Sequence, residues 1–281
     1  MKKAICIGIN DYPGSMNDLQ GCVNDANDWC ALLQGFGFDV SVMLNAQATR
    51  NNVKAALDGL VTAANAGDVV VFTYSGHGTQ VMDVSGDESD AYDEALYAYD
   101  GSVVDDDLRT IINKINPQAT LVIISDSCFS GTVTRLAAVD AKPRFVAPKG
   151  LPARRTVRRR FLLPESGMPE LLISGCTDKE YSYDADINGR YNGAMSAMAL
   201  RVISQSPNVT YAEFYAGLRK LLPSSNYPQT PQLEGMDAHK NTLLFEPFTV
   251  SPEPVPEPTP QPTTGCLRNL WQRIVRFFKG E

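Results

Sequence analysis

Residues 68–78 read Asp68-Val69-Val70-Val71-Phe72-Thr73-Tyr74-Ser75-Gly76-His77-Gly78. The β-branched and aromatic residues of this run favour a strand, and the lack of polar alternation predicts that the strand is buried on both faces. A second run of this kind, Thr120 to Ser125, leads directly into Asp126-Ser127-Cys128. Strands buried on both faces need helices above and below the sheet, so these two runs predict an α/β fold.

The segments around these runs supply the helices and the other strands. Apolar residues recur at helical spacing from Cys22 to Leu33, and a second helix should begin after the N-cap residue Thr49. This alternation is typical of βαβ units, in which a mostly parallel sheet forms the middle of three layers. The expected strands cover 4–9, 38–44, 68–74, 120–125 and 170–175, and the expected helices cover 22–33, 49–64, 105–115, 194–204 and 211–222.

The composition is that of a soluble globular protein. The chain has 281 residues, of which 43% are hydrophobic and 20% charged, with a net charge of -7. This acidic balance does not favour nucleic acid as a partner. No apolar run reaches the ~18 residues of a spanning helix, and the N-terminal apolar run is too short for a signal peptide, so we expect a cytoplasmic protein. The six cysteines include no Cys-x-x-Cys pair that would indicate zinc.

Composition divides the chain into five parts. Residues 142–160 carry eight lysines and arginines and no acid, so we expect an exposed basic loop between a larger unit, 1–141, and a smaller unit, 161–250. Residues 251–265 are rich in proline and should form a semi-rigid linker. Residues 266–281 should form a basic amphipathic helix, which is typical of a membrane-surface anchor. A helix that binds a partner protein or folds back onto the body is the alternative.

Two chemically reactive residues follow the two buried strands. His77 lies between two glycines after the first strand, and Cys128 follows the second. The carboxyl ends of parallel strands meet at one edge of the sheet, where ligands bind in doubly wound folds. A thiol becomes a strong nucleophile when an imidazole accepts its proton, so the pair is suited to nucleophilic catalysis. The alternative is that Cys128 is a small buried apolar residue, and the remaining histidine, His239, has a polar loop context.

The motifs Tyr74-Ser75-Gly76-His77-Gly78 and Ser125-Asp126-Ser127-Cys128-Phe129-Ser130-Gly131 resemble the two catalytic signatures of metacaspases and bacterial orthocaspases. The separation of His77 and Cys128, 128 − 77 = 51, is similar to the ~50 residues found in caspases. The resemblance implies a caspase-like three-layer α/β sandwich, with 1–141 as its large unit and 161–250 as its small unit. Further matching segments include 8–12, 21–26, 92–94, 104–106, 173–178, 192–194 and 229–233.

The resemblance also implies a role for each motif residue. His77 would be the general base and Cys128 the nucleophile, in a dyad that needs no third member. The backbone N–H groups of Gly78 and Cys128 would stabilise the tetrahedral oxyanion.

The same resemblance places Asp25, Ser75 and Asp126 in the pocket for the residue before the scissile bond, and Cys22 is the fourth residue that we expect to bind substrate. Two carboxylates in one pocket repel each other, and an entering guanidinium or ammonium relieves this repulsion and gains charge-assisted hydrogen bonds. We therefore expect a cysteine endopeptidase that cuts protein or peptide substrates after arginine or lysine. For Asp25 alone, a carboxylate on a helix surface is the alternative.

The basic loop joins the two units and offers many arginines, which predicts a zymogen that processes itself there. A solvated linker or docking patch is the alternative. The expected cleavage sites are Arg154, Arg155, Arg158, Arg159 and Arg160.

Three acidic residues, Asp93, Asp105 and Asp106, resemble the calcium site of calcium-activated metacaspases. Carboxylate oxygens are suitable calcium ligands. The family's fourth acidic position is Arg135 here, which removes a ligand and repels the ion. We therefore expect weak or absent calcium dependence and no required cofactor.

Two other classes of protein compete with a cysteine peptidase. The first is a catalytically silent caspase-like scaffold that only binds partners. The second is a serine hydrolase on a doubly wound sheet, but no Gly-x-Ser-x-Gly elbow precedes a suitable acid and histidine.

Overall fold

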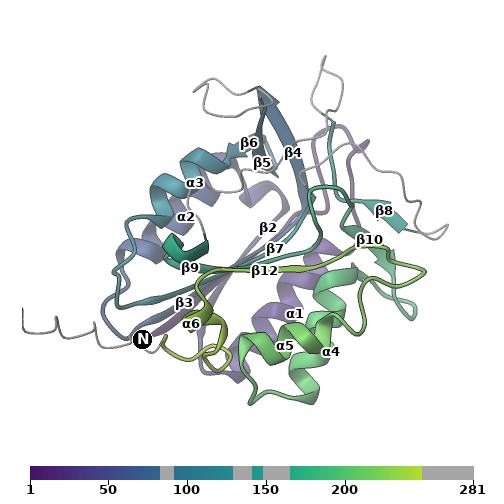
Figure 1. Ribbon diagram of the computed structural model, residues 1–281. Coiled ribbons are helices and arrows are strands. Elements are labelled where there is room, and N and C mark those ends of the chain that lie inside the picture. Colours follow the sequence, from purple (N-terminus) through teal and green to yellow (C-terminus); the bar gives the residue numbers. More distant parts are fainter. Residues whose placement is uncertain (83–91, 129–140, 148–164, 249–281) are drawn as a thin grey trace, which may run out of the picture. The chain divides into compact units, whose positions relative to one another are not determined.

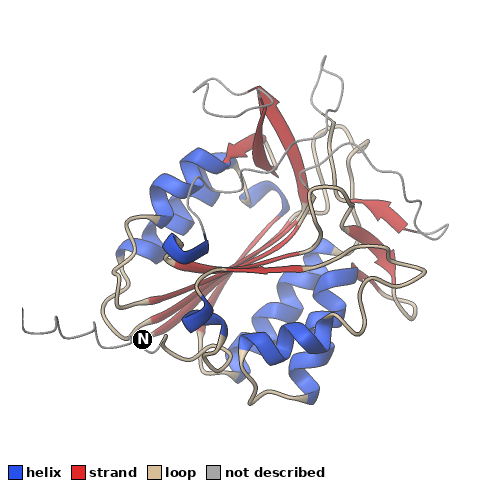
Figure 2. Ribbon diagram, in the orientation of Figure 1, coloured by secondary structure: helices blue, strands red, loops and turns tan. Residues whose placement is uncertain are grey.

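A six-stranded sheet forms the centre of the computed structural model, which describes residues 1–82, 92–128, 141–147 and 165–248 (Figures 1 and 2). Five strands run parallel, and only the edge strand β12 is antiparallel to its neighbour. This mostly parallel sheet confirms the expected α/β fold. In spatial order the strands are β12 (Gln232–Glu234), β9 (Glu170–Ser174), β7 (Thr120–Asp126), β3 (Val69–Ser75), β1 (Lys2–Gly8) and β2 (Asp39–Leu44).

The two apolar runs of the sequence form the middle of this sheet. Every residue of β3 and β7 is buried, as expected for strands covered on both faces. In their parallel register Ser75 lies opposite Asp126, and Ser75 also pairs with Gly8 of β1. The three strands therefore end at one edge, and the segments that follow β3 and β7 leave the sheet side by side.

Helices cover both faces of the sheet (Figure 1). On one face α2 (Arg50–Thr62) and α3 (Asp105–Ile112) bury their apolar side chains, and Thr49 caps α2 as expected by accepting a hydrogen bond from the Asn52 N–H. The other face holds α1 (Cys22–Gly35), α4 (Ala194–Gln205) and α5 (Tyr211–Leu218). Shorter helical segments are η1 (Asn45–Gln47), η2 (Glu165–Gly167) and α6 (Asp237–Lys240).

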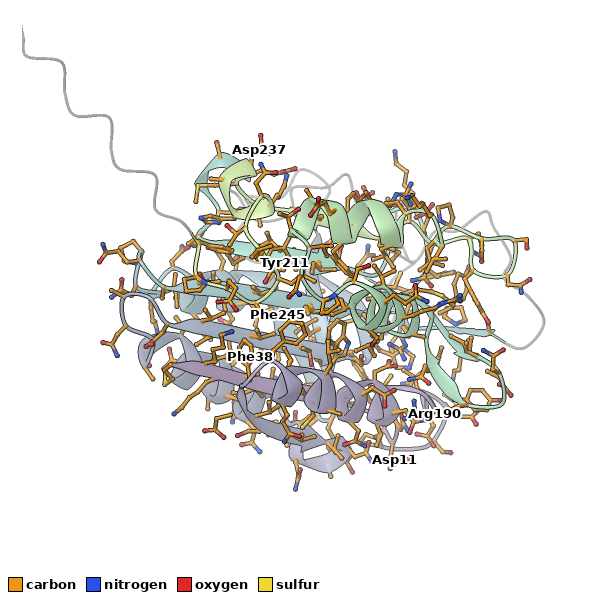
Figure 3. The ribbon with its side chains drawn as sticks, turned by 90° about the horizontal axis from the view of Figure 1, so that it is seen from below. Asp11, Phe38, Arg190, Tyr211, Asp237 and Phe245 are labelled. Atoms are coloured by element: carbon orange, nitrogen blue, oxygen red, sulfur yellow. The ribbon has the colours of Figure 1, made fainter. Side chains whose placement is uncertain are left out.

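An aromatic cluster anchors the end of the smaller part of the chain to the sheet. Phe245 packs edge-on against Phe38 and Tyr211, with ring centroids 5.9 Å and 6.2 Å apart (Figure 3). Edge-to-face pairs of this kind contribute about 0.5–1.5 kcal/mol beyond the area that they bury. Residues near the end of the described chain are thereby fixed to residues near its beginning.

Two three-stranded sheets continue from the carboxyl edge of the main sheet (Figure 1). The first contains β4 (His77–Met82), β5 (Tyr92–Ala98) and β6 (Gly101–Val104), so β4 begins two residues after β3 ends. The second contains β8 (Ala141–Pro143), β10 (Tyr183–Asp186) and β11 (Tyr191–Gly193).

The second small sheet corrects one expectation. We expected 142–160 to be an exposed loop, but 141–143 form β8 and the Arg144 side chain is 0% exposed. The reason is that β8 pairs with β10, a partner that local composition cannot reveal.

Residues Met1–Thr249 form one compact unit, and β9 of the expected small unit pairs directly with β7 of the expected large unit. The boundary between these two units therefore stays a prediction. No helix in the described part of the chain is long and apolar enough to cross a membrane. The expected linker 251–265 and helix 266–281 lie outside the described residues.

Candidate active site

The segments after β3 and β7 meet at one peptide carbonyl. The backbone N–H groups of Gly78 and Cys128 both donate to the carbonyl oxygen of Arg144, at 3.0 Å and 3.2 Å. Two N–H groups that converge on one carbonyl oxygen are the arrangement that stabilises an oxyanion during acyl transfer. The sequence placed His77 and Cys128 at the same edge, and the structure brings the N–H of Gly78, which follows His77, and the N–H of Cys128 to the same carbonyl.

The hydrogen bonds of His77 fix its tautomer. Its Nε2 lies 2.7 Å from the carbonyl oxygen of Asn17, and a carbonyl only accepts, so Nε2 carries the proton. The Nδ1 atom is then the basic nitrogen, and it is buried with no hydrogen-bond partner among the described residues. The backbone is also held, because the His77 N–H donates to the hydroxyl of Tyr12 and its carbonyl accepts from Tyr74.

Gly76 allows this close approach of the two tyrosines. A Cβ at position 76 would lie 2.7 Å from the Tyr74 hydroxyl and 2.9 Å from the Tyr12 hydroxyl. Any larger residue would therefore displace the tyrosines that hold His77.

The surroundings of His77 favour its neutral form. Burial, reinforced by the charges of Lys142 and Arg144 and partly opposed by the Asn17 carbonyl, lowers the pKa of His77 to about 4. The imidazole is therefore uncharged at neutral pH, as a general base must be.

The side chain of Cys128 is buried, and its Sγ donates to the carbonyl oxygen of Glu180 at 3.0 Å. The Glu180 side chain is itself held by the N–H and hydroxyl of Thr230, at 2.7 Å and 2.9 Å. The sulfur is thus a protonated thiol in this state, and it becomes a nucleophile once a base removes the proton.

Beside the carbonyl lies a pocket of carboxylates, which the side chain of Arg144 fills. Its Nη2 is 2.7 Å from Asp25 and 3.0 Å from Asp184, and its Nη1 is 3.3 Å from the carboxylate of Asp126. Nη1 also donates to the main-chain carbonyl of Asp126, at 3.1 Å. Burial opposes the charged guanidinium, but the surrounding acidic groups hold the pKa of Arg144 above its ordinary value.

Backbone N–H groups stabilise the three buried carboxylates. Asp25 accepts from the Gly193 N–H at 3.0 Å, and Asp126 accepts from the Ser196 N–H at 2.9 Å. Both donors lie at the N-terminal end of α4, where the helix dipole favours negative charge. Asp184 accepts from the N–H groups of Gln20 and Gly21, at 2.7 Å and 2.9 Å. Burial nevertheless raises the pKa of Asp25 to about 6, which Arg144 opposes and the charge of Asp126 reinforces.

Gly193 shapes the wall of the pocket. A Cβ at this position would lie 2.1 Å from Oδ2 of Asp126 and 2.4 Å from Nη1 of Arg144. A larger residue here would compete with the guanidinium for the same space.

The sequence identified part of this pocket. Asp25 and Asp126 both contact the guanidinium, and Cys22 is buried beside the same charged groups, where burial raises its pKa. Ser75 is buried at the same edge, opposite Asp126 in the register of β3 and β7. The sequence missed Asp184, although an Asp-x-Asp pattern in a short strand could have drawn attention to it.

The acids expected to bind calcium lie near one another. Burial, reinforced by the charges of Glu94, Asp106 and Asp93, raises the pKa of Asp105 to about 8. Among the described residues, no group of three His, Cys, Asp or Glu side chains is arranged to hold a metal ion. Arg135 and the expected cleavage sites Arg154, Arg155, Arg158, Arg159 and Arg160 lie outside the described residues.

A doubly covered parallel sheet that brings a histidine segment and a cysteine segment to one carbonyl defines a caspase-like cysteine peptidase. Comparisons with known proteins narrow this class. A family model described as "Metacaspase, peptidase C14 domain" matches residues 2–137. Metacaspase-1 of Scheffersomyces stipitis is 32% identical, over 83% of this chain and 70% of its own length. Metacaspase-1 of Schizosaccharomyces pombe is 31% identical, over 83% of this chain and 66% of its own length. The chain therefore belongs to the metacaspase family.

A solved structure supports the fold independently. The crystal structure of protein GSU0716 from Geobacter sulfurreducens matches with a TM-score of 0.71 and 29% sequence identity. The match covers 89% of this chain and 100% of that chain.

Proposed function

We propose that the protein is an endopeptidase that cuts after arginine, and less well after lysine, with Cys128 as nucleophile and His77 as general base. One observation carries the proposal. Arg144 has its guanidinium among three carboxylates while its carbonyl oxygen accepts from the N–H groups of Gly78 and Cys128. An arginine before a scissile bond needs both of these contacts at once.

The proposed chemistry uses the two N–H donors and Nδ1 of His77. His77 Nδ1 accepts the thiol proton, and the Cys128 sulfur attacks the carbonyl carbon of the arginine. The negative charge that develops on the oxygen is stabilised by the two N–H groups, which are already in place. His77 then gives its proton to the departing amine, and water hydrolyses the thioester to release the acid.

The pocket favours arginine over lysine because its acceptors lie on several sides. Nη1 reaches Asp126, while Nη2 reaches both Asp25 and Asp184. A planar guanidinium can donate in all these directions, whereas an ammonium is a compact point charge. Loss of one or two hydrogen bonds, each worth about 1.5–3 kcal/mol when charged, predicts that lysine is at least about 10-fold worse.

The decisive experiment is a panel of fluorogenic peptides that place Arg, Lys or Asp before the reporter. The wild type should hydrolyse Arg peptides best and Asp peptides not at all, and Cys128→Ala should hydrolyse none. Equal activity in Cys128→Ala would refute the assigned nucleophile. A folded wild type that hydrolyses no peptide would favour the silent scaffold.

We also propose that catalysis needs no calcium, because the position of the fourth acidic ligand is occupied by Arg135. Peptide hydrolysis should persist in a chelator that removes calcium. Complete loss of activity in the chelator, restored by added calcium, would contradict this.

A further inference from the structure

Residues before Arg144 bind as an added strand. In β8, Lys142 pairs with Asp184 and Pro143 with Tyr183 of the antiparallel strand β10. The Arg144 N–H then donates to the carbonyl oxygen of Ser182, at 2.9 Å. A peptide that adds a strand to an exposed sheet edge is a common way for a protein to hold an extended ligand.

Residues after Arg144 are held as well. The Val146 N–H donates to the carbonyl oxygen of Gly78 at 3.0 Å, and the Val146 carbonyl accepts from the Thr79 hydroxyl at 2.7 Å. The ring of Phe145 lies against that of Tyr181, with centroids 6.2 Å apart. The chain is therefore fixed on both sides of one peptide bond, the bond between Arg144 and Phe145.

The side chains of 141–147 differ in burial. Lys142 is exposed, Arg144 is 0% exposed, and Phe145 and Val146 are half-buried. Of the two cations in 141–147, only Arg144 enters the carboxylate pocket. The carbonyl oxygen of Arg144 is also the one that accepts from the N–H groups of Gly78 and Cys128. No other carbonyl of the strand has both of these contacts.

From this geometry we propose that 141–147 is the enzyme's own first substrate, and that Arg144–Phe145 is the bond cut in self-processing. The inference rests on the proposed function, and it replaces the five arginines between 154 and 160 as the primary cleavage site. The same strand keeps the uncut chain closed to other substrates, because the pocket and both oxyanion donors are already occupied.

The reaction consumes one water and leaves the enzyme unchanged apart from the cut. The thiol proton of Cys128 moves to Nδ1 of His77, and a bond forms between the sulfur and the Arg144 carbonyl carbon. The Arg144–Phe145 C–N bond breaks, and the His77 proton passes to the Phe145 nitrogen. Water then cleaves the thioester, which regenerates the thiol and leaves a new carboxylate on Arg144. The thiol must first turn away from the Glu180 carbonyl that it contacts.

The cut should occur within one chain rather than between chains. Only residues 129–140 separate Cys128 from β8, so the substrate strand is tethered close to the nucleophile. A short tether gives a high effective concentration, and a unimolecular reaction has a rate that does not depend on protein concentration.

Release of the strand is then a separate step. After the cut, Arg144 keeps its contacts with the carboxylates until β8 leaves β10. Hydrolysis of added peptides should therefore begin after a lag that follows the appearance of the fragments.

The test is N-terminal sequencing of the fragments formed by purified full-length protein. The wild type should give a fragment that begins at Phe145. A variant with all five arginines 154, 155, 158, 159 and 160 changed to Gln should give the same fragment at the same rate. Arg144→Gln should not give it, and Arg144→Lys, which keeps a charge in the pocket, should give it more slowly.

A dilution series distinguishes a cut within one chain from a cut between chains, and a mixing experiment tests the same point independently. The fraction cut per minute should be unchanged over a 100-fold dilution, an experimental range chosen to distinguish first-order from second-order kinetics. A tagged Cys128→Ala chain mixed with the wild type should stay uncut at Arg144 while the wild type is processed.

The peptide panel distinguishes failure of this inference from failure of the proposed function. If the wild type hydrolyses Arg peptides but is cut only after 154–160, or is not cut at all, the Arg144 inference is wrong and the function stands. If no variant hydrolyses any peptide and no fragment forms, the proposed function fails as well.

Discussion

The Asp184→Asn substitution tests the pocket at the residue that the sequence missed. Asp184 Oδ1 is 3.0 Å from Nη2 of Arg144, and its two oxygens also accept from the Gln20 and Gly21 N–H groups. Asparagine removes the charge and places an NH₂ donor against groups that are donors themselves. Asp25 and Asp126 remain, so the guanidinium keeps part of its binding energy.

The expected magnitude follows from the loss of one charge-assisted hydrogen bond, about 1.5–3 kcal/mol. At 1.4 kcal/mol per factor of ten, kcat/KM for Arg peptides should fall by about 10-fold to about 150-fold. The matched control is Asp186→Asn, on the same strand but exposed and bonded to the Gly189 N–H. Thermal unfolding of both variants checks the fold. An Asp184→Asn enzyme as active as the wild type, or equal losses in both variants, would refute the assigned pocket.

Three further predictions concern the base, the pocket wall and the fold. Burial lowers the pKa of His77 to about 4, so the base stays deprotonated down to about pH 5, and complete loss of self-cleavage on gels should come only below that value. Protonation of Asp25, whose pKa burial raises to about 6, should weaken the pocket and lower the rate only in part between pH 7 and pH 5; complete loss centred near pH 6.5 would contradict the assigned base. Gly193→Ala should abolish hydrolysis of Arg peptides because its Cβ would lie 2.4 Å from the guanidinium, whereas Gly59→Ala, in open space on α2, should leave hydrolysis unchanged. Glu170 and Arg109 form a buried pair with N–O distances of 2.5 Å and 3.0 Å, so Glu170→Gln should lower the free energy of unfolding in urea by about 3–5 kcal/mol. Asp58→Asn, which breaks the exposed Asp58–Lys114 pair, should lower the free energy of unfolding by less than about 1 kcal/mol. Equal losses of stability in Glu170→Gln and Asp58→Asn would contradict the role of burial.

Local sequence patterns were sufficient for the central sheet and for the meeting of its two functional segments. The apolar runs that became β3 and β7 need burial on both faces, and that need fixes their place at the centre. Once both strands are parallel neighbours, His77 and Cys128 must leave the sheet at the same edge. The backbone contacts of Gly78 and Cys128 with one carbonyl agree with this argument.

The contents of the pocket depended on contacts between distant segments. Asp184 reaches the guanidinium because β10 lies beside β8. The residues around Asp184 in the sequence do not predict that β8 is the neighbouring strand. Arg144 belongs to a run of basic residues that composition alone marks as solvated. Pairing of β8 with β10 brings Arg144 to Asp184, and Asp25 and Asp126 enclose the same guanidinium, so its burial follows from contacts with distant segments rather than from composition.

The central claim is that the Cys128 sulfur attacks a carbonyl whose arginine side chain lies in the carboxylate pocket. The most direct measurement is peptide mapping by mass spectrometry after labelling with an arginyl chloromethyl ketone, on the wild type and on Arg144→Gln. The account predicts a single adduct on Cys128 and none from the matching aspartyl reagent. An adduct on another residue of a protein that hydrolyses Arg peptides, or equal labelling by both reagents, would contradict it.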